Sequence, residues 1–282
     1  MITERIDLFE YFKTAREGAE RGTLACYRHT QIAELGVKRL RPAILIIPGG
    51  AYAFVSEKEA EPVALRYFAQ GFDCFVLDYD IAPHGYPVQI EEAAMAMLYL
   101  RRECAALGLT GRIAVMGFSA GGHLAGCVSF LWRDGAIRAR FREECEKVRP
   151  DASLLCYPVV TADERCWHRD SFYNFCGGDA SRFSAYSLEK HVPADAPPVF
   201  LWSTNEDVCV PPENSVALYA ALRRAKIPAE LHIFEEGWHG MSVADLESNA
   251  DYAGQRPYRR AERWVDLSLD FLSAHGFAVE TV

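Results

Sequence analysis

One serine in this sequence has the surroundings of a catalytic nucleophile. Residues Gly117–Gly121 read Gly-Phe-Ser-Ala-Gly, with Ser119 at the centre. An apolar run, Ile113–Met116, precedes them, and a helical pattern follows. A sharp turn from a strand into a helix exposes such a hydroxyl group, and the flanking glycines leave room for the close backbone packing that the turn needs. The segment therefore predicts acyl-transfer chemistry at Ser119.

A nucleophilic serine needs a general base, and eight histidines are available for that role. His239 lies in a glycine-flanked segment after a short apolar run, and it follows Ser119 in the chain. His123, one helical turn beyond the serine, is the main competitor, while His232 lies inside the apolar run itself. Because a base has to approach the hydroxyl from another loop, the sequence favours His239 and predicts a structural role for His123.

The histidine in turn needs a carboxylate to orient it. Glu206 and Asp207 both follow the apolar run Val199–Trp202. Asp245 comes after His239, which breaks the chain order serine, acid, histidine that this type of fold uses. Spacing alone leaves the choice between Glu206 and Asp207 open.

An acyl-transfer site also needs two backbone N–H groups that stabilise the negative oxygen of the intermediate, the oxyanion hole. Ala120, directly after the serine, predicts one of them. The other is expected from the loop Pro48–Tyr52, where two glycines permit a close backbone approach. An ordinary glycine turn is the alternative interpretation of that loop.

These residues require elements that bring them together, and the apolar pattern supplies candidates. Short apolar runs alternate with helical patterns, which indicates a mostly parallel sheet with helices on both faces. The predicted strands are Ala43–Ile47, Cys74–Leu77, Ile113–Met116, Ala152–Cys156, Val199–Trp202 and Leu231–Phe234. The predicted helices are Glu59–Ala69, Gln89–Leu107, Gly121–Leu131, Asn214–Ala225 and Tyr258–His275.

Length and the order of the motifs predict a single domain over residues 1–282. The alternation of strands and helices is interrupted at about 133–149 and 160–191, which are expected to be small inserted cap segments near one edge of the sheet. Half of the residues are hydrophobic, which is enough for a large core. A net charge of −9 argues against a nucleic-acid or anionic-membrane partner.

The nine cysteines form no Cys-x-x-Cys pair, so the sequence predicts neither a zinc site nor a disulfide framework. No metal or other cofactor is expected. The first twenty residues have no apolar signal region, and no apolar run approaches the ~18 residues of a membrane span. We therefore expect a cytoplasmic protein whose partner is a small-molecule ester; a homodimer is compatible with the sequence.

In order along the chain, the segments PGGAY, GFSAGGHLAG, PPVFLWSTNEDVCVPPENS and ELHIFEEGWHG resemble the bacterial acetyl esterase and acetylxylan-esterase-like branch of the α/β-hydrolase superfamily, which is related to hormone-sensitive lipase. The resemblance covers roughly residues 40–242. It implies an α/β-hydrolase fold, with Ser119 as nucleophile, His239 as base and Asp207, rather than Glu206, as the acid.

The resemblance also implies that the N–H groups of Gly50, Ala51 and Ala120 form the oxyanion hole. The lipase-type loop reads His-Gly-Gly-Gly, whereas here Pro48 replaces the histidine and Ala51 the last glycine. Ala51 keeps its N–H group but needs a compatible backbone angle.

Together these features predict a serine esterase for short-chain, acetyl esters, and the resemblance implies a sugar as the alcohol. Aromatic side chains beside the motifs, Tyr52, Phe118 and Trp238, are candidates for substrate binding, although core packing explains each equally well. The alternatives are a serine peptidase of the prolyl-oligopeptidase type and a non-catalytic ligand-binding protein on a hydrolase fold.

Overall fold

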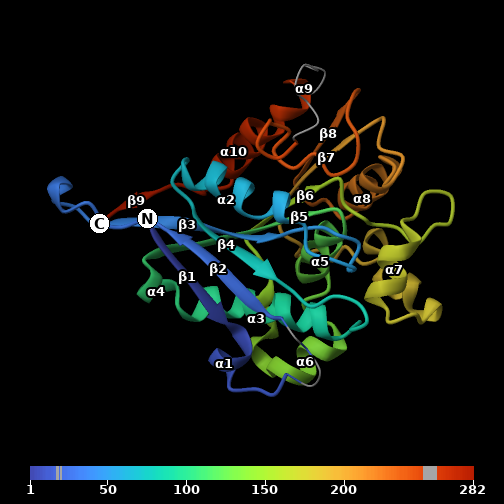
Figure 1. The fold of residues 1–282 in the computed structure, drawn as a ribbon, viewed down its shortest axis with the longest axis horizontal. Coiled ribbons are helices and arrows are strands. Elements are labelled where there is room, and N and C mark those ends of the chain that lie inside the picture. Colours follow the sequence, from blue (N-terminus) through green and yellow to red (C-terminus); the bar gives the residue numbers. More distant parts are fainter. Residues whose placement is uncertain (17–18, 20, 250–258) are drawn as a thin grey trace.

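The computed structural model describes residues 1–16, 19, 21–249 and 259–282. In this part of the chain, nine strands form a central sheet (Figure 1). They are β1 (Ile2–Asp7), β2 (Thr23–Arg28), β3 (Arg39–Ile47), β4 (Asp73–Asp78), β5 (Leu109–Phe118), β6 (Ala152–Cys156), β7 (Val199–Thr204), β8 (Ala229–Phe234) and β9 (Glu280–Thr281). All six predicted strands are present as parts of β3 to β8.

The strand order is β1-β2-β4-β3-β5-β6-β7-β8. The six strands from β4 to β8 run parallel to their neighbours, while β1 pairs with β2, and β2 with β4, in antiparallel fashion. Short β9 pairs with the start of β3. Because parallel strands end at the same edge of the sheet, the loops after β3, β5, β7 and β8 lie along one edge.

Helices cover both faces of the sheet (Figure 1). They are α1 (Leu8–Phe12), α2 (Glu61–Phe68), α3 (Val88–Arg102), α4 (Cys104–Leu107), α5 (Ala120–Phe130), α6 (Gly135–Phe141), α7 (Arg169–Phe175), α8 (Glu213–Arg224), α9 (Arg259–Glu262) and α10 (Trp264–Ala274). The 3₁₀ segments are η1 (Ala33–Leu35), η2 (Glu57–Glu59), η3 (Arg142–Val148), η4 (Ala180–Tyr186) and η5 (Leu188–Lys190).

Alternate residues of β3 enter two separate cores. Leu45 and Ile47 pack in the core that contains α3, α5 and α8, whereas Ile44 and Ile46 pack in the core that contains α2 and α10. All four side chains are fully buried, which explains why a central parallel strand is apolar at every position. The chain therefore has the predicted α/β-hydrolase architecture, a mostly parallel sheet between two layers of helices.

The predicted helices differ from the observed ones in their boundaries. The predicted helix Gln89–Leu107 is divided into α3 and α4 at Glu103, and Gly108, with φ 74°, ends α4. Only a residue without a side chain adopts that backbone angle readily. The predicted helix over Tyr258–His275 begins at residue 258, outside the described residues, and the rest of it forms α9 and α10.

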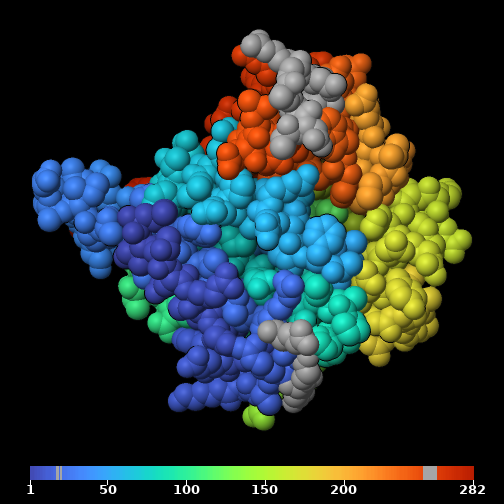
Figure 2. Space-filling model, viewed as in Figure 1, coloured from blue at the N-terminus to red at the C-terminus, as the bar shows by residue number. Residues whose placement is uncertain are grey.

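The two predicted insertions pack mainly against different elements but touch each other. Residues 133–149 form α6 and η3, which pack against α3. Residues 160–191 include α7, η4 and η5, and in Figure 2 they form the yellow lobe beside the loop that follows β3. Asp134 joins the two segments, because its carboxylate accepts a hydrogen bond from the Tyr186 hydroxyl at 3.3 Å. That the whole chain forms one domain stays a prediction.

Candidate active site

Three side chains from three loops form one hydrogen-bonded chain at the edge of the sheet. The Ser119 Oγ lies 2.7 Å from His239 Nε2, and His239 Nδ1 lies 2.7 Å from Asp207 Oδ2. They follow β5, β8 and β7 respectively. Since a carboxylate only accepts hydrogen bonds, the His239 Nδ1 carries a proton and donates it, and the neutral Nε2 is left to accept from the serine hydroxyl.

The turn around Ser119 has room only for glycine on both sides. A Cβ atom at Gly117 would lie 2.2 Å from the Gly121 carbonyl oxygen, and one at Gly121 would lie 2.1 Å from the oxygen of Ile47. Ser119 itself has φ 54° and ψ −119°, a strained backbone for a residue with a side chain. This packing explains the glycine spacing and holds the hydroxyl at the N-terminus of α5.

Glu206 and Asp207, the two acids between which spacing could not choose, have different hydrogen-bond partners in the structure. The Oδ1 atom of Asp207 accepts from the backbone N–H groups of Cys209 and Val210, at 3.0 and 2.8 Å, which turns Oδ2 toward the histidine. The Glu206 carboxylate instead accepts the backbone N–H of Gly237 at 2.9 Å. Asp207 therefore faces His239, and Glu206 braces the loop on which the histidine lies.

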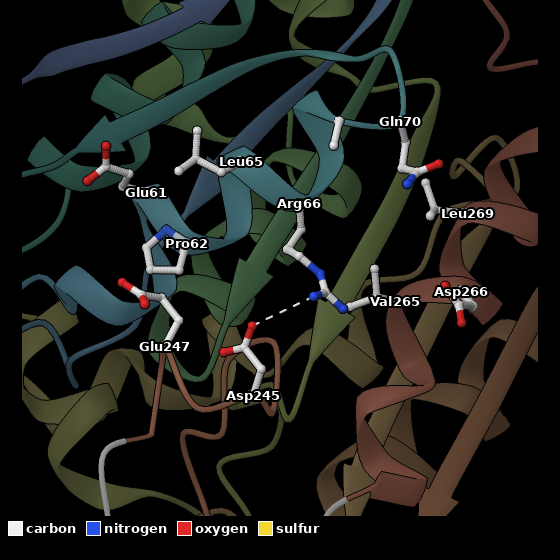
Figure 3. Close-up of a pocket in the computed structure, with 11 residues that line it drawn as sticks. Glu61, Pro62, Leu65, Arg66, Gln70, Asp245, Glu247, Val265, Asp266 and Leu269 are labelled. Atoms are coloured by element: carbon white, nitrogen blue, oxygen red, sulfur yellow. Dashed lines mark ion pairs between the residues drawn. The ribbon is translucent and has the colours of Figure 1, made fainter.

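Asp245, the acid in the wrong chain order, lies elsewhere. It faces Arg66 at 3.8 Å in a groove of about 460 Å³ between α2 and α10 (Figure 3). In the close-up, Arg66 extends from α2 toward this carboxylate, and Val265 of α10 also lines the groove. None of the three hydrogen-bonded residues lines this groove.

The competing histidines have other partners. His123 is fully enclosed: its Nε2 donates to the Tyr186 carbonyl at 2.8 Å, so its Nδ1 accepts from the Tyr52 hydroxyl at 2.7 Å. Burial lowers the pKa of His123 to about 4. With both ring nitrogens occupied by other groups, His123 has no free nitrogen for the serine. His232 faces Glu230 along β8 at 3.2 Å.

The loop after β3 presents two peptide N–H groups beside the serine. The Gly49 carbonyl accepts from Ser56 N at 3.0 Å, and the Gly50 carbonyl accepts from Ala53 N and Phe54 N at 2.8 and 3.1 Å. In a trans peptide the N–H points away from the carbonyl of the same unit. The N–H groups of Gly50 and Ala51 therefore point away from these contacts, and neither has an acceptor among the described residues.

This loop lies against the nucleophile and adopts backbone angles with positive φ. A Cβ atom at Gly49 would be 2.9 Å from the Cβ of Ser119. Gly50 has φ 122°, and a Cβ there would lie 2.0 Å from the Phe54 carbonyl oxygen; Ala51 has φ 56°. Ala51 thus adopts the angle that its place in the loop requires, and it keeps its N–H available. Ala120 is the first residue of α5.

The predicted substrate-binding aromatics are placed differently. Tyr52 and Phe118 are both fully buried. The Phe118 ring packs against Tyr157 and Trp264 in the core below α2 and α10, because it lies on the same face of β5 as Met116. Their positions do not support the prediction that they contact substrate; core packing explains them. Trp238 is half-buried beside His239.

The inserted segment 160–191 contributes groups that sequence analysis missed. The Asn174 side chain donates to the Ala51 carbonyl at 2.8 Å, which ties α7 to the loop after β3. His168 is half-buried, and its Nδ1 lies 2.8 Å from Ser171 Oγ. Burial, followed by the nearby His239, lowers the pKa of His168. No spacing rule points to these residues, since their contacts join segments far apart in the chain.

Among the residues that the structure describes, no group of three or more histidine, cysteine or acidic side chains could hold a metal ion. In the same residues, no helix is both long and apolar enough to cross a membrane. All nine cysteines are free thiols.

Each half of the chain matches a known protein family. Residues 34–157 match the BD-FAE family, and residues 167–265 match the prolyl oligopeptidase family. The chain is 34% identical over 224 residues to endo-1,4-β-xylanase B of Butyrivibrio fibrisolvens, and 31% identical over 207 residues to the acetylxylan esterase of Xylanibacter ruminicola. These matches cover 76% and 70% of this chain, but only 34% and 40% of those longer proteins.

A solved structure is similar over nearly the whole chain. The acetyl ester-xyloside bifunctional hydrolase of Caldicellulosiruptor lactoaceticus is 32% identical and superposes with a TM-score of 0.77. The match covers 90% of this chain and 88% of that protein. The chain therefore belongs to the acetyl-esterase and acetylxylan-esterase-like branch of the α/β-hydrolase superfamily, a branch of carboxylic ester hydrolases.

Proposed function

We propose that this chain is a serine esterase that hydrolyses short-chain esters, acetyl esters above all. The observation that carries the proposal is the hydrogen-bonded series Ser119–His239–Asp207, next to a loop whose Gly50 and Ala51 N–H groups have no acceptor among the described residues. The series supplies a nucleophile with its base, and the loop supplies donors for the charge that develops on the substrate oxygen.

In the proposed acylation step, Ser119 Oγ attacks the ester carbonyl carbon while His239 Nε2 takes the hydroxyl proton. The resulting imidazolium is stabilised by the Asp207 carboxylate, which keeps Nδ1 protonated. The N–H groups of Gly50, Ala51 and Ala120 hold the oxyanion. His239 then gives its proton to the departing alcohol oxygen, and the C–O bond of the ester breaks.

Deacylation repeats these steps with water as the nucleophile. Nε2 of His239 takes a proton from the water, whose oxygen attacks the carbonyl carbon of the acyl-enzyme. The oxyanion of this second intermediate accepts hydrogen bonds from the same N–H groups. When it collapses, the ester bond to Ser119 breaks, the serine recovers its proton from His239, and the carboxylic acid leaves.

The sugar as alcohol component is the finer part of the proposal. It is supported by the names of the relatives, an acetylxylan esterase and an acetyl ester-xyloside hydrolase. Nine free thiols suit a reducing compartment, which supports a cytoplasmic enzyme acting on imported, acetylated oligosaccharides. Assembly as a homodimer stays a prediction for sedimentation velocity to measure.

A serine peptidase of the prolyl-oligopeptidase type is the second candidate, because residues 167–265 match that family. Such a peptidase uses the same series of side chains, so the geometry does not distinguish a peptidase from an esterase. The two activities are distinguished by the hydrolysis rates of p-nitrophenyl acetate and of an aminoacyl p-nitroanilide, and the proposal requires the ester to be cleaved faster. A protein that cleaves neither would be a ligand-binding protein on a hydrolase fold.

The proposal is tested with esters from acetyl to octanoyl and with acetylated xylo-oligosaccharides. Ser119→Ala should lower kcat by about 10⁴-fold or more, with the fold retained. His239→Ala should have a comparable effect, whereas His232→Ala, a control on the preceding strand, should leave kcat within about threefold. Ester hydrolysis that survives in Ser119→Ala or His239→Ala contradicts the assignment.

A further inference from the structure

A buried carboxylate lies beneath the site and is not part of the Ser119–His239–Asp207 series. Glu59, the last residue of η2, is 2% exposed, and among the described residues it forms no ion pair. Its Oε2 accepts from Gly49 N at 2.8 Å, and its Oε1 accepts from the Tyr157 hydroxyl at 2.7 Å. A buried carboxylate without a cation is a poor source of fold stability. Its two partners therefore indicate what it does.

The first partner belongs to the loop that carries the oxyanion donors. Glu59 holds the N–H of Gly49, while Ser56 N holds the carbonyl of the same residue at 3.0 Å. That carbonyl and the Gly50 N–H belong to one rigid peptide unit. With both sides of Gly49 fixed, the direction of the Gly50 N–H is fixed too. The contact is close to the nucleophile, since a Cβ on Gly49 would lie 2.8 Å from Glu59 Oε2 and 2.9 Å from the Ser119 Cβ.

The second partner belongs to the surroundings of the histidine. The Tyr157 ring lies edge-on to the His239 ring, with 5.1 Å between centroids. Its hydroxyl accepts from Ser242 N at 2.9 Å, three residues after the histidine. Burial and the Glu59 carboxylate raise the pKa of the Tyr157 phenol, so it remains a donor to Glu59. A Cβ on Gly240 would lie 3.9 Å from Glu59 Oε1, which places the carboxylate directly under this loop.

The two loops come from strands that are not neighbours. The oxyanion loop follows β3 and the histidine loop follows β8, with β5, β6 and β7 between them in the sheet. No strand pairing sets their relative position. Resting on the proposed function, we infer that Glu59 is a positioning residue that holds the oxyanion loop and, through Tyr157, the His239 loop in register for one transition state.

The test replaces Glu59 with glutamine, which keeps the shape and offers one acceptor where the site needs two. Its NH₂ group faces either the Gly49 N–H or the Tyr157 hydroxyl, so one of these two donors loses its buried acceptor and the anchor on that side is weakened. Glu57→Gln is the matched control, because Glu57 is exposed in the same 3₁₀ segment. Tyr157→Phe removes the second anchor alone and keeps the ring against His239.

Two rates are measured and divided by the folded fraction from near-UV circular dichroism. The first is the phosphonylation of Ser119 by an alkyl p-nitrophenyl phosphonate, which needs the same base and oxyanion donors. The second is p-nitrophenyl acetate turnover. Glu59→Gln should lower the phosphonylation rate constant and kcat by about 10- to 100-fold, with KM within about threefold. Tyr157→Phe should lower both by about 3- to 30-fold, and Glu57→Gln by less than about twofold.

A purely structural Glu59 would reduce the folded fraction and leave both normalised rates unchanged, and that result overturns the inference. If Glu59→Gln does not fold, unchanged rates in Tyr157→Phe overturn it equally, while lowered rates support it. A wild-type protein that reacts with the phosphonate but hydrolyses no ester refutes the proposed function, and the ratio of phosphonylation rates still decides the role of Glu59. A wild-type protein inert to both reagents refutes both.

Discussion

Replacing Asp207 by asparagine should nearly abolish activity without unfolding the protein. In the wild type, Oδ1 accepts from two backbone N–H groups, those of Cys209 and Val210, and Oδ2 accepts from His239 Nδ1. Asparagine has a single oxygen. This oxygen is expected to accept from the two backbone N–H groups. If the amide turned around, both N–H groups would face the NH₂ donor, which costs about 1–3 kcal/mol of stability for each buried group left unpaired.

The amide NH₂ then faces the histidine and changes its tautomer. Since NH₂ only donates, His239 Nδ1 has to accept, and the remaining proton moves to Nε2. Nε2 can no longer take the Ser119 proton. A wrong tautomer in such a series costs about 10⁴ in kcat, which corresponds to about 5.5 kcal/mol of transition-state stabilisation. KM should stay close to the wild-type value, because the substrate contacts are not altered.

The assay is p-nitrophenyl acetate hydrolysis at pH 7, with thermal unfolding as the check on folding. Glu206→Gln is the matched control: this neighbouring acid accepts one bond from Gly237 N, which the amide oxygen preserves, so kcat should stay within about threefold. Retention of more than a hundredth of the activity in Asp207→Asn would refute this reasoning. So would an equal loss in Glu206→Gln, which would assign the acid role to the wrong residue.

Two buried groups should give the free energy of unfolding opposite pH dependences. Burial raises the pKa of Glu92 to about 8, so the folded state binds this proton more tightly than the unfolded state. The free energy of unfolding should therefore fall as pH rises from about 4.5 to 8. In urea unfolding, Glu92→Gln should remove roughly 2–5 kcal/mol of that decline. Burial lowers the pKa of His123 to about 4, so the folded state binds this proton less tightly than the unfolded state. Stability should therefore fall by roughly 2–4 kcal/mol as pH drops from about 6.5 to 4, and His123→Gln should flatten that part of the curve. Unchanged slopes in either variant would show that the group titrates alike in both states.

The central strands could be predicted because they are buried on both faces and therefore apolar at nearly every position. Strands β1 and β2 were missed, since they lie at the antiparallel edge and carry charged residues. Their signal is weaker but present: in β2, buried Leu24 and Cys26 alternate with more exposed neighbours. The same period of two, applied to β5, would have directed Phe118 into the core with Met116 rather than toward a substrate.

Chain order and local motifs also indicated the serine and the histidine, but they could not choose between adjacent acids. What separates Glu206 from Asp207 is the direction of each side chain, which depends on donors at Gly237, Cys209 and Val210. Glu59 carried no signal at all. Its partners are ten and ninety-eight residues away, and only the folded sheet brings them together.

The strained backbone of the site limits how this protein can be engineered for heat resistance. Ala51, Tyr52 and Ser119 have φ of 56°, 57° and 54°, angles at which a side chain costs on the order of 1–3 kcal/mol. All three lie in the loops that build the site. Selection for heat resistance alone would favour glycine at positions 51 and 119 and would discard the Ser119 hydroxyl with the strain. Tyr52 differs, because its buried side chain packs in the core and hydrogen-bonds to His123. A screen for hardier variants of this protein therefore has to select for turnover at the same time, or leave these two loops untouched.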